Sequence, residues 1–167
     1  MSAMFDDLLT ANHHYVEEFS LAGMAPRAAR EFALVTCMDT RIEPLSMLGL
    51  VPGDAKIMRN AGGRVTPDVL RSLSLAVQYL GVRRIAVMQH TGCAMVSLTE
   101  EQIRSDLAAA GRQVDRSWEF LAMPDPDLAL RGDVDLVRGC ELIPSETAVE
   151  GWRYDVETGA ITRIVAG

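Results

Sequence analysis

The 167-residue sequence lacks the features that mark secreted and membrane-spanning proteins. Its three cysteines are an odd number and none belongs to a Cys-x-x-Cys pair, so a disulfide framework is not expected and reduced thiols are. No apolar run approaches the ~20 residues that span a bilayer. The acidic start lacks the basic region of a signal peptide. We therefore expect a soluble, cytoplasmic protein with no membrane association.

Positive charge is also scarce. The 16 Lys and Arg residues against 23 Asp and Glu give a net charge of −7, which argues against a general binder of nucleic acid or anionic membranes. We find no internal repeat, low-complexity tract or domain linker. What the chain does have is 49% hydrophobic residues, enough for a packed core, and a length that fits one domain. We predict a single domain over residues 1–167.

Apolar periodicity predicts that strands and helices alternate along the chain. Buried strands are expected at 31–36, 54–59 and 84–88. Helices are expected at 3–21, 42–50, 66–80, 99–110 and about 128–138, with an irregular segment at 112–127. Residues 147–156 and 161–165 are expected to pair as a hairpin. This order predicts an α/β fold: a mainly parallel central β-sheet flanked by helices, with a C-terminal β-hairpin.

Reactive side chains follow two of the predicted strands. Cys37 comes directly after the first strand, and His90 and Cys93 come after the third. Open α/β sheets place their ligand sites at the carboxyl ends of the strands, so we expect these side chains to meet. Two thiolates and one imidazole favour zinc, and a set of three leaves the fourth position open, as in catalytic zinc sites. Because Cys37 is far from His90 in the chain, a small zinc finger is excluded.

Asp39 and Arg41 lie two positions apart, so their side chains point the same way in an extended chain. A bidentate grip by Arg41 would keep Asp39 ionised and able to orient a water molecule on the metal. An Asp39 that is not held would instead be a possible fourth zinc ligand in a closed state. If Asp39 exchanges between the two positions, activity would be lost at lower pH. The sequence leaves both arrangements open.

Three motifs together resemble the β-class carbonic anhydrases of the short bacterial type. They are Cys37-Met38-Asp39-Thr40-Arg41, Arg59-Asn60-Ala61-Gly62-Gly63 and His90-Thr91-Gly92-Cys93. Their order and separations match this family, and the likeness extends to the hairpin around 151–159.

The resemblance has implications for cofactor, chemistry and assembly. It implies one zinc ion per chain on Cys37, His90 and Cys93, with Asp39 and Arg41 as the catalytic pair. It implies reversible hydration of carbon dioxide to bicarbonate and a proton through a zinc-bound hydroxide. It also implies a homodimer, or a tetramer of the dimer-of-dimers type, in which the N-terminal helix within 1–22 packs across the partner.

Other functions remain open at this point. Relatives on the same fold hydrolyse carbonyl sulfide or carbon disulfide, and a non-catalytic zinc-binding scaffold or regulator with four filled ligand positions is a third alternative. Gln89, Gly92 and Ala94 depart from the residues that many or some relatives carry, and we expect them to line the mouth of the site. The backbone amides of Gly62 and Gly63 are candidates for substrate binding.

The remaining polar residues are given ordinary structural roles. Arg64 is expected to be a surface charge, and Cys140 to be structural or exposed. His13 and His14 are expected on a helix face. Glu100 and Glu101 are expected to stabilise the start of a helix rather than to act in acid–base chemistry.

Overall fold

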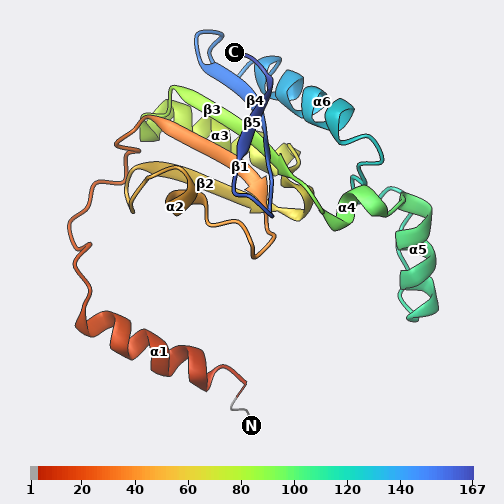
Figure 1. Cartoon of the computed structure of the whole chain (residues 1–167), viewed down its shortest axis with the longest axis horizontal. Helices are drawn as coiled ribbons and strands as arrows, with labels where there is room; N and C mark the ends of the chain where they lie inside the picture. The colour runs from red at the N-terminus through yellow and green to blue at the C-terminus, as the bar shows by residue number, and fades with distance from the viewer. Residues whose placement is uncertain (1–3) are drawn as a thin grey trace.

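The computed structural model describes residues 4–167, and its strands form one five-stranded sheet (Figure 1). The sheet order is β2-β1-β3-β4-β5. The strands are β1 (Phe32–Cys37), β2 (Ala55–Asn60), β3 (Arg84–His90), β4 (Ala148–Tyr154) and β5 (Ile161–Val165). β1 pairs in parallel with β2 and β3, β3 pairs in parallel with β4, and β5 returns antiparallel to β4. The predicted mainly parallel sheet with a C-terminal hairpin is confirmed.

Two apolar clusters pack against the sheet. The buried apolar residues of α3 (Pro67–Leu80) and α6 (Pro126–Arg138) join the first cluster, together with Ala33 and Val35 of β1. Leu34 and Cys37 of β1 belong to the second cluster, which also includes Met88 and Met123. Because alternate strand residues point to opposite faces, burial of both faces produces the continuous apolar runs that marked these strands in the sequence.

The helix starts follow from local capping. The Thr66 side chain accepts a hydrogen bond from Val69 N at 3.3 Å, and Gly81 ends α3 in the left-handed region with φ 76°. Thr99 caps α5 (Glu100–Ala109) in the same way. The expected start of α6 near residue 128 was late, because Asp125 caps the helix and Pro126 occupies its first turn.

Several other boundaries differ from the predicted ones. β1 and β2 each lie one residue later, and the expected helix 42–50 is reduced to α2 (Pro44–Met47). A short α4 (Ala94–Ser97) was not expected. β3 continues two residues beyond the predicted end, because Gln89 and His90 pair with β4. His90 is therefore the last residue of a strand.

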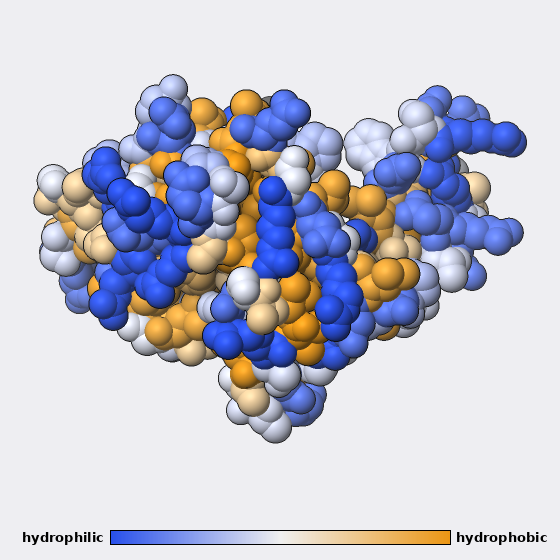
Figure 2. Space-filling model, turned by 90° about the horizontal axis from the view of Figure 1, so that it is seen from above, coloured by the Kyte–Doolittle hydropathy of each residue, from blue (hydrophilic) through white to orange (hydrophobic). Residues whose placement is uncertain are grey.

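The N-terminal helix α1 (Asp6–Glu17) stands away from the rest of the chain (Figure 1). It is shorter than the predicted 3–21, and residue 3 lies outside the described residues. Its apolar residues are exposed and none of its residues is buried. α5 also projects from the body of the protein (Figure 1). The surface around α5 is mostly hydrophilic, whereas apolar residues appear among charged ones over the centre of the molecule (Figure 2). Within residues 4–167, no helix has the length and apolar character needed to cross a membrane.

Two charged residues have roles that differ from those predicted. Arg64 is not a surface charge: it forms an ion pair with Asp133 of α6, and its side chain is 14% exposed. Glu100 does more than stabilise the start of α5, because its carboxylate accepts hydrogen bonds from Phe120 N and Ala122 N at 3.1 Å. Both side chains bind partners that are distant in sequence.

Candidate metal centre

Cys37, His90 and Cys93 meet at the carboxyl edge of the sheet. All three are buried, and their ligand atoms lie within 4.8 Å of one another. Cys37 ends β1 and His90 ends β3, which is the neighbouring parallel strand. Cys93 precedes α4 and is reached through a turn at Gly92, whose φ of +66° favours glycine. The convergence predicted from the two strand ends is confirmed.

The donors in this group fit a zinc ion. His90 Nδ1 lies 2.9 Å from the carbonyl oxygen of Thr91, so this nitrogen carries the proton and donates it to the carbonyl. His90 Nε2 then has a free lone pair, and it is buried without a hydrogen-bond partner. An unpaired buried nitrogen is costly unless an ion or another group satisfies it. One imidazole nitrogen beside two thiol sulfurs is a donor set that zinc prefers.

The two thiols differ in how readily they ionise. Burial raises the pKa of the Cys37 thiol, but the His90 ring in its protonated form and the backbone N–H groups of Asp39 and Gly62 outweigh it and bring the pKa to about 7. Burial raises the pKa of Cys93, and an N–H group of Met95 only partly opposes this. Thiolates are the forms that bind metal, so backbone N–H groups directed at both sulfurs favour metal binding.

Asp39 and Arg41 form the bidentate pair that the sequence suggested as one of two arrangements. Arg41 Nε donates to Asp39 Oδ1 at 2.9 Å, Arg41 Nη2 donates to Oδ2 at 2.8 Å, and the backbone N–H of Arg41 also donates to Oδ1. These hydrogen bonds hold the pKa of the Asp39 carboxyl well below its usual range. Asp39 Oδ2 lies 3.8 Å from His90 Nε2, so the ionised carboxylate is held at the edge of the metal ligands.

Two further contacts tie this pair to the metal ligands. Arg41 Nη2 donates to Gly92 O at 3.2 Å, which connects it to the turn that carries Cys93. Arg59 Nε donates to Cys37 O at 3.0 Å, and Arg59 Nη2 donates to Asp39 O at 2.6 Å. Arg59 belongs to one of the three sequence motifs, but the sequence alone suggested no role for it. Its place near the end of β2, beside β1, was the available signal.

A cavity of about 350 Å³ opens beside the metal ligands. It is lined by Cys37, Met38, Asp39, Thr40, Arg41, Ala61, Gly62, Cys93, Ala94 and Met95. Ala94 thus lines the site as expected, and Gly62 lines it as well. Gly63 is packed against the backbone of β1 and β3, and a Cβ there would lie 2.9 Å from Cys37 N. Gln89 does not line the mouth, because it is 1% exposed and strand alternation points it to the face opposite His90.

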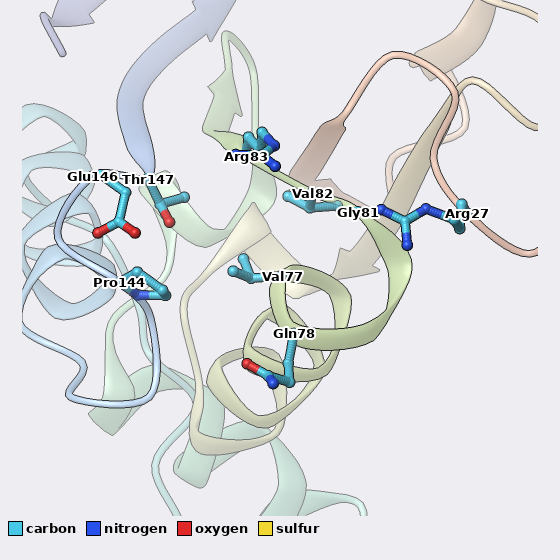
Figure 3. Close-up of a pocket in the computed structure, with 9 residues that line it drawn as sticks. All are labelled: Arg27, Val77, Gln78, Gly81, Val82, Arg83, Pro144, Glu146 and Thr147. Carbon is cyan, nitrogen blue, oxygen red and sulfur yellow. The ribbon is translucent and has the colours of Figure 1, made fainter.

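Another cavity, of about 330 Å³, lies where β3 and β4 begin (Figure 3). It is lined in part by Arg27, Arg83 and Glu146. Arg83 pairs with Glu31 at 3.2 Å, and Arg27 lies against Gly81 at the end of α3, where a positive charge complements the helix dipole. Both arginines thus have structural partners, and no predicted site residue lines this cavity. The candidate functional site is therefore the metal centre.

Known proteins are similar to this chain over most of its length. The family model described as carbonic anhydrase matches residues 32–121. β-Carbonic anhydrase 1 of Mycobacterium tuberculosis is 31% identical over 160 residues, which cover 95% of this chain and 96% of that protein. Carbon disulfide hydrolase of an Acidianus species is 35% identical over 153 residues, covering 77% of this chain and 74% of that protein. A crystal structure of carbonic anhydrase from Streptococcus mutans has a TM-score of 0.89 and 38% identity, covering 98% of each chain.

Proposed function

The chain belongs to the β-class carbonic anhydrase family, and we propose that it is a zinc lyase whose preferred reaction is the reversible hydration of carbon dioxide to bicarbonate and a proton. One observation carries this proposal: two buried thiols of the zinc-binding group line a cavity that also contains Asp39 in the grip of Arg41. Cys37, His90 and Cys93 would hold one zinc ion per chain. A zinc ion in such a site lowers the pKa of water and makes it a nucleophile near neutral pH.

Asp39 orients the attacking water molecule. An ionised carboxylate accepts hydrogen bonds and donates none, so it binds the water through a proton and directs an oxygen lone pair away from itself. Arg41 keeps Asp39 ionised and fixes both of its oxygens. Because Arg41 also binds Gly92 O, the carboxylate keeps its position relative to Cys93.

The cavity wall suits a small, linear, uncharged substrate. The side chains of Met38, Ala61, Ala94 and Met95 line it and offer no hydrogen-bond donors. Carbon dioxide needs proximity to the nucleophile more than polar recognition, and an apolar wall excludes competing water from its position. The N–H group of Gly62 is directed at the Cys37 sulfur, so at this residue we propose the cavity surface, rather than an amide, as the substrate contact.

Removing the Arg41 side chain tests the role of the pair. We expect Arg41→Ala to lower kcat/KM for carbon dioxide hydration by about 10–100-fold while zinc stays bound, because Asp39 loses the groups that hold it and is free to approach the metal. Metal content and stopped-flow hydration of the same sample measure both quantities. Arg71→Ala is the control, since Arg71 is 65% exposed and pairs with Asp68 on the surface of α3. Full activity in Arg41→Ala would contradict the assigned role.

Carbonyl sulfide and carbon disulfide are the second candidate substrates. The 35% identity to a carbon disulfide hydrolase favours them, and the same apolar wall accepts them. Stopped-flow hydration of carbon dioxide, compared with sulfide release from the other two gases, decides between these reactions. We expect the largest kcat/KM for carbon dioxide. Sulfide release by a zinc-loaded protein that hydrates carbon dioxide no faster than buffer would overturn the proposal.

A non-catalytic zinc scaffold is the third candidate, and it requires a fourth ligand. Within residues 4–167, the group with metal-binding geometry has three members. Asp39 is near enough to be a fourth, but it is bound to Arg41 through both oxygens. An open position binds small anions, so azide binding to the cobalt-substituted protein is expected. A spectrum unchanged by azide would favour the scaffold.

We also propose that residues 1–167 form one cytoplasmic domain that assembles as a homodimer, or as a tetramer of two dimers. The support is α1, which buries none of its residues, while Phe5, Leu8, Leu9 and Val16 are each about 60% exposed. Exposed apolar residues on one helix are typical of a protein–protein contact, and a second copy is the partner that requires no other protein. Light scattering measures the mass, and a monomer at micromolar concentration would overturn this assignment.

A further inference from the structure

Arg64, which follows the turn at 61–63, forms an ion pair with Asp133 of α6. Arg64 Nε donates to Asp133 Oδ2 at 2.7 Å, and Arg64 Nη2 donates to Oδ1 at 3.2 Å. The Asp133 side chain is 1% exposed. A buried ion pair loses so much hydration that an apolar pair of similar size often gives equal or greater stability. Stability alone is therefore a weak explanation for a buried ion pair at this position. The other contacts of Arg64 and Asp133 indicate a second role.

The backbone of Arg64 closes the turn next to Cys37. The Asn60 side chain accepts from Arg64 N at 2.8 Å and donates to Arg64 O at 2.7 Å. These two hydrogen bonds enclose the short turn at 61–63. Within that turn, Gly63 packs against Cys37, because a Cβ on Gly63 would lie 2.9 Å from Cys37 N. The position of Arg64 therefore fixes the turn that packs against a metal ligand.

The side chain of Arg64 also fixes a second segment at the site. Its Nη1 donates to Leu121 O at 2.8 Å. Leu121 has φ 59°, in the left-handed region that leucine rarely occupies, and such strain persists only where surrounding contacts hold it. Two residues later, Met123 is buried, and its Cε would lie 3.0 Å from a Cβ on Gly62. Arg64 thus joins the turn at 61–63 to the segment that packs against it.

Asp133 connects the pair to the strand that ends in His90. α6, which carries Asp133, packs against both β3 and β4. The ion pair is therefore linked to β3, which carries His90, through α6, and to β1, which carries Cys37, through the turn at 61–63.

We propose that Arg64 and Asp133 are positioning residues for the zinc centre: they hold the turn at 61–63 against the backbone of Cys37, so that this ligand keeps its position and zinc is released slowly. The inference rests on the zinc centre described above. Groups that bind metal ligands from outside typically change metal affinity by 10–100-fold. Zinc release is measured without substrate, so failure of this inference and failure of the proposed carbon dioxide hydration are distinguishable.

The double variant Arg64→Met/Asp133→Leu tests the proposal, because it replaces the ion pair with apolar side chains and leaves no buried unpaired charge. We expect its zinc to transfer to an excess of chelator at least about 10-fold faster than zinc of the unchanged protein. Circular dichroism establishes that the variant is folded. The matched control is Arg71→Met/Asp68→Leu, which removes an exposed ion pair on α3 whose N–O distance is also 2.7 Å. The control is expected to release zinc at the unchanged rate.

A second variant covers the case in which the double variant does not fold. Arg64→Lys keeps a cation beside Asp133, but a single ammonium group cannot reproduce the planar bidentate pairing and also reach Leu121 O. Its zinc release is expected to be faster than that of the unchanged protein and slower than that of the double variant. An unchanged rate of zinc release in either of these variants, when folded, would overturn the proposal and leave the ion pair a purely structural role.

Discussion

Cys93→Ser is expected to lower zinc affinity by more than about 100-fold and to reduce carbon dioxide hydration to the level of zinc-free protein. Mutation of groups that only bind the metal ligands already lowers metal affinity by 10–100-fold, so the loss of a ligand itself is expected to lower the affinity more. Cys93 supplies one of the two sulfur donors of the metal-binding group. Serine has nearly the same size, but its hydroxyl is not ionised near neutral pH and is a poor zinc ligand. The change therefore removes a donor without leaving a large cavity.

Cys140→Ser is the matched control for this prediction. Cys140 is also a free, partly buried cysteine, and it lies outside the metal-binding group. The control variant is expected to keep one zinc ion per chain and unchanged kcat/KM. Zinc content by atomic emission and hydration by stopped flow are measured on both variants. A Cys93→Ser protein that retains zinc and activity would show that the ligands have been assigned to the wrong residues.

Gly63→Ala is expected to destabilise the protein by roughly 3–5 kcal/mol, which is exceptional for the addition of one methyl group. Gly63 has φ +66°, and a Cβ there would lie 2.9 Å from both Cys37 N and Met88 O. These atoms belong to the backbone of β1 and β3, two central strands that cannot move apart without losing their pairing. The left-handed conformation adds about 1–2 kcal/mol for a residue with a Cβ. Urea unfolding at a fixed protein and zinc concentration measures the loss.

Gly111→Ala separates the two causes. Gly111 has φ +73°, but a Cβ at this position would have no atom within 4 Å. Alanine at position 111 therefore has the backbone cost without the clash. Gly111→Ala is expected to lower the free energy of unfolding by about 1–2 kcal/mol. Equal losses in the two variants would contradict the close contact at Gly63 that places the 61–63 turn beside Cys37.

The position of the site was predictable because it depends on local patterns. Apolar runs that end in Cys37 and His90 mark strand ends, and parallel strands bring their carboxyl ends to one edge. The end of β3 was misplaced because Gln89 and His90 pair with β4, which is distant in sequence. Such pairing leaves no signal within β3 itself.

Arg64 is the clearest example of what the sequence could not indicate. A single arginine after a glycine turn is typical of the surface. Its partner Asp133 lies on α6, and only the packing of α6 against the sheet brings the two charges together. Asp39 is the intermediate case: its spacing from Arg41 predicted two arrangements, and the structure has the one in which Arg41 binds both carboxylate oxygens.

The rate of carbon dioxide hydration as a function of zinc content tests the central claim most directly. Zinc is removed with a chelator and restored in steps, and the initial rate is recorded at each step by stopped flow. We predict a rate equal to that of buffer without zinc and a linear rise that stops at one zinc ion per chain. Full activity of the zinc-free protein, or a zinc-loaded protein no faster than buffer, would contradict the assignment of this site as a zinc-dependent catalyst.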